Sequence, residues 1–316
     1  MDVVTFGEMM GVFNPSKMGS LDFVNEFYKS IGGAEGNVAV GLARLEKKAG
    51  FVTRVGNDPF GREITSLLKG EGVDITRVQT DQHHPTGIYF KEKRNSEITN
   101  VYYYRGNSAA SQMNMNDLDE DYIKQAKWLH LTGITPLLSN SCKSLVMKSI
   151  DLAKKHNVKI SFDPNIRYKI MKDVDASRKV FLEIASHVDL ILPGVSEGKF
   201  MVDEEDPVAI ANELLSLGAK NIVIKLGAKG AYFKNNEEEK FVEGVKVNHI
   251  VDSVGAGDGF AAGVLSALID NLPLERAVVL GNQIGALMVM CEGDIEGFPT
   301  MEEICEFTNN SEDILR

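Results

Sequence analysis

Short apolar runs alternate with stretches of helical period along most of the chain. Apolar residues recur at helical spacing between the runs, as at Val38, Leu42 and Leu45, which predicts helices with one face in a core. Because strands that alternate with helices form parallel sheets covered by helices, the pattern predicts an α/β fold. The apolar runs predict strands at residues 3–6, 51–55, 128–131, 159–162, 190–192 and 221–225.

Two stretches interrupt this alternation. The β-prone segments 86–92 and 99–105 are joined by a polar tip at 93–98, which predicts an antiparallel hairpin that can act as a lid. Residues 13–30 also lack a helical period, and we expect them to add strands to the same small sheet. Since the chain shows no internal repeat and no linker, we predict one domain over residues 1–316, with lid strands from about 11–31 and 86–106.

Composition narrows the class of protein. With 316 residues, 43% of them hydrophobic and 25% charged, the chain has enough apolar material for a large core. The net charge of −11, without any basic run, argues against nucleic acid as a partner. No apolar run approaches membrane-spanning length, so we expect no membrane partner.

The three cysteines, Cys142, Cys291 and Cys305, are far apart in the sequence. Their spacing argues against both a disulfide framework and a structural zinc site. The N-terminus also lacks a basic stretch followed by an apolar segment. We therefore expect a cytoplasmic protein.

A glycine-rich turn, Asp-Ser-Val-Gly-Ala-Gly-Asp at 252–258, is the strongest chemical signal. It precedes a segment in which Phe260, Val264 and Leu268 mark one helical face, so its glycines lie at a helix N-terminus. Free N–H groups and the helix dipole favour an anion there, and Asp258 is placed to accept a proton from an attacking hydroxyl. The alternative is a plain helix cap, with Asp258 as a carboxylate favoured by the dipole.

The turn is neither of the two commonest nucleotide loops. A dinucleotide fingerprint requires a third glycine at position 260, where the chain has phenylalanine. The sequence also contains no Gly-x-x-x-x-Gly-Lys-Ser/Thr loop.

Two motifs together resemble those of the ribokinase-like (PfkB) carbohydrate kinases. The segment 252–258 is similar to the family's C-terminal signature, and Gly-Gly-Ala-Glu-Gly-Asn-Val-Ala at 32–39 is similar to its N-terminal motif. The resemblance covers essentially the whole chain. It implies a ribokinase-like three-layer sandwich with a mainly parallel central sheet and a small β-sheet lid, and an ATP- and Mg²⁺-dependent sugar kinase.

The resemblance also implies roles for individual residues of both motifs. Asp258 becomes the catalytic base that deprotonates a sugar hydroxyl, with Gly255, Ala256 and Gly257 as the anion hole. The sugar is expected to bind at Gly33, Ala34, Glu35, Gly36 and Asn37. The alternative to sugar binding by Asn37 is that its side chain caps the N-terminus of the following helix.

The nucleotide positions that the resemblance implies lie mainly in the C-terminal half. The turn at 225–230 resembles the family's Lys/Thr-x-Gly-x-x-Gly turn, and Asn282 matches an asparagine in the helix beside the adenine. The residues expected near ATP are Asn165, Arg167, Ser196, Lys225, Gly227, Gly230, Gly255, Ala256, Gly257 and Asn282.

Metal sites follow from the same resemblance. Gly194 stands where many relatives carry the asparagine of an Asn-x-x-Glu motif, so Glu197 is expected to organise Mg²⁺ only through water. Asp252 and Val254 are expected to supply oxygens to a monovalent cation such as K⁺.

The basic residues indicate that the acceptor of the phosphoryl group is a sugar acid. Arg105 on the hairpin and Arg167 after a strand end are expected to face one cleft, where arginine can bind a carboxylate bidentately. The segments 33–39, 103–111 and 163–167 resemble the 2-keto-3-deoxygluconate kinases (2-dehydro-3-deoxygluconokinases) of the family. This implies that ATP phosphorylates the 6-hydroxyl of that sugar acid, held by Tyr89, Tyr103, Arg105, Arg167, Asp258 and Asp294.

Several alternatives remain open from the sequence. The tyrosines can be cross-strand pairs only, Arg167 can contact the nucleotide phosphates, and Asp294 can lie in an exposed turn. The rival functions are a fructokinase or other ketose kinase, and a sugar- or nucleotide-binding sensor without activity. Because a lid has exposed strand edges, we also expect a homo-oligomer that forms through the β lid.

Overall fold

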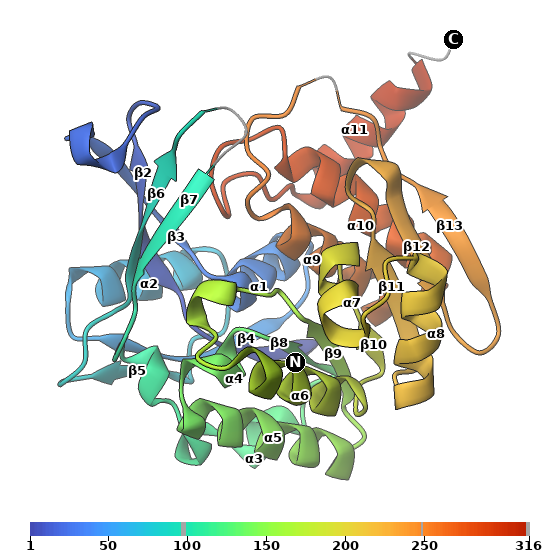
Figure 1. Ribbon diagram of the computed structural model, residues 1–316, viewed down its shortest axis with the longest axis horizontal. Helices are drawn as coiled ribbons and strands as arrows, with labels where there is room; N and C mark the ends of the chain where they lie inside the picture. The colour runs from blue at the N-terminus through green and yellow to red at the C-terminus, as the bar shows by residue number, and fades with distance from the viewer. Residues whose placement is uncertain (96–98, 248, 314–316) are drawn as a thin grey trace.

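The computed structural model describes residues 1–95, 99–247 and 249–313, which form two β-sheets and the helices that cover them (Figure 1). The larger sheet has nine strands in the order β13-β12-β11-β10-β9-β8-β1-β4-β5. Neighbouring strands from β11 to β5 are parallel, whereas β12 is antiparallel to both β11 and β13. The predicted α/β class with a mainly parallel central sheet is confirmed.

Six strands of this sheet were predicted within a few residues of their ends, and three were not. The strand β5 was missed because it is short and half polar, and β12 and β13 because residues 225–230 were interpreted only as a nucleotide turn. The strands are β1 (Val3–Phe6), β4 (Ala49–Gly56), β5 (Val78–Asp81), β8 (Trp128–Thr132), β9 (Lys159–Asp163), β10 (Leu190–Ile191), β11 (Asn221–Lys225), β12 (Gly230–Lys234) and β13 (Glu239–Glu243).

A hydrophobic core lies on each face of the larger sheet. Successive strand residues face opposite sides, so Val3 belongs to one core and Val4 to the other. One core contains residues of α1 (Ala34–Arg44), α2 (Pro59–Gly70), α9 (Ala256–Ile269), α10 (Leu274–Met288) and α11 (Met301–Asp313). The other contains residues of α3 (Glu120–Ile123), α4 (Thr135–Leu138), α5 (Asn140–Lys155), α6 (Val174–Ala185), α7 (Val195–Val202) and α8 (Pro207–Leu217). Short 3₁₀ helices lie at Leu21–Phe23, Ala110–Gln112, Met115–Asp117, Tyr168–Ile170 and Gly227–Lys229.

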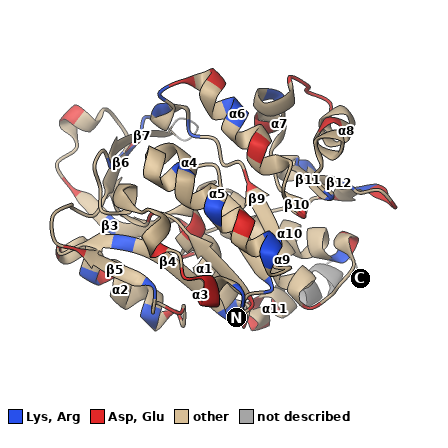
Figure 2. Cartoon of the chain, turned by 90° about the horizontal axis from the view of Figure 1, so that it is seen from below, with Lys and Arg blue, Asp and Glu red and all other residues tan. Residues whose placement is uncertain are grey.

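The outer faces of the helices carry the charges. Four lysines and one aspartate, Asp151, lie along α5, on the side away from the sheet (Figure 2). Within the described residues, no helix combines the length and the apolar character that crossing a membrane requires.

The smaller sheet is the predicted lid. Its strands are β2 (Met10–Pro15), β3 (Phe27–Gly32), β6 (Ile88–Lys93) and β7 (Thr99–Tyr104), in the order β3-β2-β6-β7. The hairpin β6–β7 is antiparallel, with Tyr89 opposite Tyr103, and residues 96–98 of its predicted tip lie outside the described residues. The inner face of the sheet packs Met10, Val12 and Tyr89 together, and the outer face stacks the rings of Phe13 and Phe90 with centroids 4.6 Å apart.

The helix α9 is buried almost all round. The sequence predicted only one core-facing stripe, but every residue from Asp258 to Ala267 is buried, because α9 packs between α1 and α10. Glycines allow the close approach: a methyl group on Gly263 would lie 2.9 Å from the Cα of Gly281 in α10. This packing fixes the N-terminus of α9, and with it the 252–258 turn.

Candidate active site

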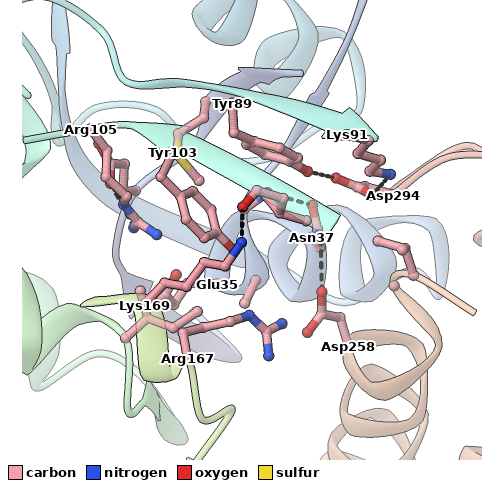
Figure 3. A pocket seen from close by; sticks show the side chains of 18 of the residues that line it. Glu35, Asn37, Tyr89, Lys91, Tyr103, Arg105, Arg167, Lys169, Asp258 and Asp294 are labelled. Atoms are coloured by element: carbon pink, nitrogen blue, oxygen red, sulfur yellow. Dashed lines mark hydrogen bonds and ion pairs between the residues drawn. The ribbon is translucent and has the colours of Figure 1, made fainter. Parts of the chain in front are cut away.

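A cavity of about 430 Å³ lies where the carboxyl ends of the parallel strands meet the inner face of the lid (Figure 3). We call it the lid pocket. Ligands of open parallel sheets bind at this edge, because loops that follow neighbouring strands converge there. Its wall includes Glu8, Gly33, Ala34, Glu35, Asn37, Tyr89, Lys91, Tyr103, Arg105, Ile134, Arg167, Lys169, Val254, Gly255, Asp258 and Asp294.

A second cavity of about 330 Å³ lies between the β11–β12 turn and the helices α9 and α10. We call it the helix pocket. Its wall is largely apolar, with Val247, Phe260, Ala286 and Val289. It also contains six of the predicted nucleotide residues: Lys225, Gly227, Gly230, Ala256, Gly257 and Asn282.

The glycine-rich turn separates the two pockets. Gly255 and Asp258 line the lid pocket, whereas Ala256 and Gly257 line the helix pocket. The helix begins at Ala256 after Gly255, whose φ of 78° is in the left-handed region that favours glycine. A methyl group on Gly255 would also lie 2.6 Å from the carbonyl oxygen of Asp294.

The first N–H of α9 that bonds within the helix is that of Gly259, which donates to the Gly255 carbonyl at 2.8 Å. Among the described residues, the N–H groups of Ala256, Gly257 and Asp258 have no partner. Three free donors at the positive end of a helix dipole form an anion site. Two of these donors, those of Ala256 and Gly257, belong to the predicted anion hole, and their binding of an anion stays a prediction.

Two amide side chains hold the Asp258 carboxylate in place. Asn37 Nδ2 donates to Oδ2 at 2.8 Å, and Asn165 Nδ2 donates to Oδ1 at 3.2 Å. Burial raises the pKa of Asp258 to about 7, against the Asn37 hydrogen bond and the charges of Arg167 and Lys225, which lower it. A carboxylate with such a pKa suits proton transfer near neutral pH.

The structure decides between the two interpretations of Asn37. The N-cap of α1 is Gly33, and Asn37 lies one turn inside the helix, so the N-cap alternative is wrong. The Asn37 Oδ1 accepts from the Gly33 N–H at 3.1 Å, while its Nδ2 bonds Asp258. Asn37 thus links the two signature motifs, which are 221 residues apart.

Asn165, predicted near the nucleotide, lines neither pocket. It follows β9 and is buried, with its amide on Asp258. Its spacing from Asp258 along the chain gave no sign of this contact.

The lid residues form a buried cluster with Asp294. Only 2% of Asp294 is exposed, so the alternative of an exposed turn is wrong. Its Oδ2 accepts from the Tyr89 hydroxyl, and its Oδ1 accepts from Lys91 Nζ at 2.8 Å. Burial and the Asp294 charge raise the pKa of Tyr89 well above its usual value, so the hydroxyl stays a donor. The rings of Tyr89 and Tyr103 are a cross-strand pair, and both also line the lid pocket.

The two predicted arginines both reach the lid pocket, but their charges are not equivalent. Arg105 is buried and forms an ion pair with Glu8, at 2.6 Å between Nη2 and Oε2. Sequence reasoning missed Glu8, which directly follows the glycine after β1, and therefore treated Arg105 as uncompensated. Arg167 is exposed, has no carboxylate within ion-pair distance among the described residues, and extends toward Asp258 (Figure 3).

The remaining residues of the N-terminal motif differ in position. Gly33 and Ala34 line the lid pocket, whereas Gly36 packs against Met9 away from it. Glu35 is fully buried, and its Oε1 accepts from the hydroxyls of Thr132 and Thr135, both at 2.6 Å. Burial raises the pKa of Glu35. Its carboxylate thus joins α1 to the loop after β8.

Four of the ten predicted nucleotide residues lie outside the helix pocket: Asn165 and Gly255, described above, and Ser196 and Arg167. Ser196 is exposed in the first turn of α7, and Arg167 belongs to the lid pocket. Lys225 lines the helix pocket, where its Nζ donates to Asp163 Oδ2 at 2.7 Å.

Neither predicted metal position forms a complete site. Glu197 caps its own helix: Oε1 accepts from the Ile166 N–H at 2.9 Å and Oε2 from the Gly194 N–H at 2.7 Å. Among the described residues, no three His, Cys, Asp or Glu side chains come together as a metal cluster. Glu197 fits a water-mediated contact with Mg²⁺ better than direct ligation, because backbone donors already engage both oxygens.

Asp252 and Val254, predicted to hold a monovalent cation, do not offer a free anionic site. Asp252 Oδ1 accepts from the Val254 N–H at 3.1 Å. Its Oδ2 lies 3.9 Å from the Lys91 ammonium, so a fixed cation is already beside the carboxylate.

The sequence and the fold match known sugar kinases over most of their length. The model of the pfkB family of carbohydrate kinases matches residues 1–301. A 2-dehydro-3-deoxygluconokinase of Bacillus subtilis is 42% identical over 97% of this chain and 95% of its own. A probable chloroplastic fructokinase of Arabidopsis thaliana is 34% identical over 96% of this chain and 81% of its own.

A solved structure agrees with these sequence matches. A putative ribokinase II of E. coli, solved in complex with ATP and Mg²⁺, superimposes with a TM-score of 0.89 at 28% identity, over 98% of this chain and 99% of its own. Together with the two pockets and the anion site between them, these matches identify the chain as a member of the pfkB carbohydrate kinase family, a phosphotransferase.

Proposed function

We propose that this kinase transfers the γ-phosphoryl group of ATP to the 6-hydroxyl of 2-keto-3-deoxygluconate. The observation that carries the proposal is the uncompensated Arg167, which lies in the same pocket as Asp258. Guanidinium binds carboxylate bidentately, and a protein of net charge −11 otherwise repels an anionic sugar. The name of the Bacillus subtilis relative supports the same acceptor.

In this proposal the acceptor occupies the lid pocket, with its carboxylate on Arg167 and its 6-hydroxyl at Asp258. The base takes the hydroxyl proton while Asn37 and Asn165 hold its two oxygens in a fixed orientation. The oxygen then attacks the γ-phosphorus across the turn. The free N–H groups of Ala256, Gly257 and Asp258 stabilise the charge on the transferring group.

ATP in this proposal occupies the helix pocket, with its base against the apolar wall and its phosphates toward Gly257 and Lys225. Mg²⁺, when bound with the nucleotide, neutralises charge on the β- and γ-phosphates. Glu197 would hold the Mg²⁺ through water, because backbone N–H groups already bond both of its carboxylate oxygens.

A panel of acceptors tests the substrate. Purified protein should release ADP with 2-keto-3-deoxygluconate at a kcat/KM at least about tenfold above that with fructose. Removing the proposed ion pair by Arg167→Gln should raise the KM for the sugar acid by about tenfold to a hundredfold, at about 1.5–3 kcal/mol for a charged hydrogen bond. Arg62→Gln, in α2, is the matched control and should leave the KM for the sugar acid unchanged.

The second candidate is a ketose kinase, which the Arabidopsis thaliana relative favours by its name. Higher turnover of fructose, with a KM that Arg167→Gln leaves unchanged, would establish that function instead. An inactive sensor is the third candidate. Its hallmark would be sugar or ATP binding without ADP release.

Replacing the proposed base separates the kinase from the sensor. Asp258→Asn should lower kcat by roughly two or more orders of magnitude while ATP binding, measured by calorimetry, stays nearly the same. Full activity of this variant would refute the role of Asp258.

A further inference from the structure

A buried lysine of the lid lies beside the glycine-rich turn. Lys91, on β6, is 1% exposed and has its Nζ 2.8 Å from Asp294 Oδ1 (Figure 3) and 3.9 Å from Asp252 Oδ2. It is the only lysine among the largest fully buried side chains of the described residues. A lysine is seldom fully buried unless it is paired, so its position needs a reason.

Both carboxylates belong to residues in or beside the glycine-rich turn. Asp252 orients the turn through the Val254 N–H, and the Asp294 carbonyl packs against Gly255 at the helix N-cap. The side chains of Asp252 and Asp294 are 11% and 2% exposed. Two negative charges, one buried and one largely buried, beside the turn would oppose the binding of phosphate oxygens there. A positive charge between them offsets this repulsion.

We propose that the Lys91 ammonium takes the place of a monovalent cation beside the 252–254 segment, so that this kinase needs no added K⁺. A mobile K⁺ at Asp252 would stand next to a fixed charge of the same sign, which makes its binding unfavourable. Lys91 lines the lid pocket, but its Nζ is paired with Asp294, so in this proposal it acts through the turn as a positioning residue. The inference rests on the proposed phosphoryl transfer at this turn.

The experiment measures kcat with the Tris salt of ATP and Mg²⁺, with KCl titrated against LiCl at equal ionic strength. The kcat of the wild-type protein should differ by less than about twofold between LiCl and KCl. Lys91→Met, close in shape but neutral, should lose about tenfold or more in LiCl and regain most of it in KCl, because K⁺ can now bind between the two carboxylates. Lys93→Met, which removes a lid lysine paired with Glu292, is the matched control and should behave as wild type.

A second readout does not depend on activity. The unfolding temperature of Lys91→Met should rise with KCl more than with LiCl, since an ion that binds only the folded state stabilises it, and that of the wild type should not. Lys91→Arg keeps the charge and should stay independent of K⁺. If Lys91→Met does not fold, the K⁺ dependence of the wild type and of Lys91→Arg still tests the inference, because both should be independent of K⁺.

Stimulation of the wild type by K⁺ several-fold would overturn the inference. So would a Lys91→Met variant that K⁺ does not rescue, because Lys91 would then be only a structural ion pair. Absence of ADP release with every sugar would instead refute the proposed function, and the unfolding temperatures would still test the cation.

Discussion

At the scale of single residues, Asp258 sets the pH dependence. Its folded-state pKa of about 7 is raised mainly by burial, and the proposed base works only when deprotonated. We therefore expect kcat/KM to rise with pH and reach half its maximum near pH 7, about three units above an ordinary aspartate. A pH–rate profile measured with saturating Mg²⁺ checks this. An acidic limb near pH 4 would contradict it.

The same pKa predicts a cost in stability. A carboxyl with a raised folded-state pKa leaves stability unaffected below the unfolded value of 3.8, and it destabilises progressively as pH rises to about 7. At about 1.4 kcal/mol per pKa unit the cost is on the order of 4 kcal/mol above pH 7. Asp258→Asn, which removes the charge, should therefore unfold at a higher temperature than wild type at pH 8.

The comparison at low pH provides the control. Near pH 4 both the wild-type carboxyl and the variant amide are neutral in the folded state, so the two unfolding temperatures should nearly coincide. An equal difference in unfolding temperature at both pH values would mean that the amide acts by changing the packing, and that burial of the charged carboxylate does not destabilise the fold.

The positions of site residues were predictable where a local motif carries them. Asp258 and the glycines before it were recognised because helix N-termini have a local signature. The ion pair between Arg105 and Glu8 was not, because 97 residues separate the partners and nothing in either local sequence marks the contact. The same holds for Asn165 and Asp258, 93 residues apart, and for Lys91, which looked like any polar residue of an alternating strand.

At the scale of elements, the glycine contact between α9 and α10 positions the anion site. A methyl group on Gly263 would clash with the backbone at Gly281, which cannot move without shifting a helix. Gly263→Ala should therefore lower the free energy of unfolding by about 1–3 kcal/mol. Gly70→Ala, at the end of α2 with open space around the new methyl group, should be neutral or stabilising by up to about 1 kcal/mol. Urea unfolding of the two variants measures the difference, and equal effects would refute this account of the packing.

The strands that sequence reasoning missed lie at or next to the edges of the sheet. Periodicity identifies an element from the environment of its side chains, and β5 and β13 lie at the two edges of the sheet, where that environment is mixed. The strand β12, next to the edge, directly follows the turn that was interpreted only as a nucleotide site. The opposite error occurred for α9: the sequence predicted a single core-facing stripe, whereas the helix is buried almost all round. Parallel strands flanked on both faces, such as β1, gave the clearest signal.

At the scale of the whole molecule, topology brings the chemistry together. The loops after β1, β8 and β9 converge because parallel strands have their carboxyl ends at one edge, so Glu8, Ile134 and Arg167 line one pocket. The lid pocket lies where this rule expects a ligand. The charge balance inside the pocket was not predictable from the sequence, because it depends on which loop side chains meet.

The lid leads to the last prediction, a homo-oligomer. Its edge strands β3 and β7 leave backbone groups without a strand partner in the four-stranded sheet. Exposed aromatic side chains lie on them, Tyr28 at 71% and Tyr104 at 65%. Exposed edges of this kind pair readily with a second copy, so we expect a homodimer through the lid, with about twice the 34.7 kDa mass of one chain.

Light scattering after size exclusion measures that mass. Tyr104→Asp should weaken the dimer about tenfold or more, because a charge would be buried in an apolar contact. Phe241→Asp alters an aromatic residue that is similarly exposed, at 57%, but on β13 at the far edge of the larger sheet, and it should leave the mass unchanged. A monomeric wild type at micromolar concentration would refute the dimer, and a Phe241→Asp variant that dissociates as Tyr104→Asp does would move the interface away from the lid.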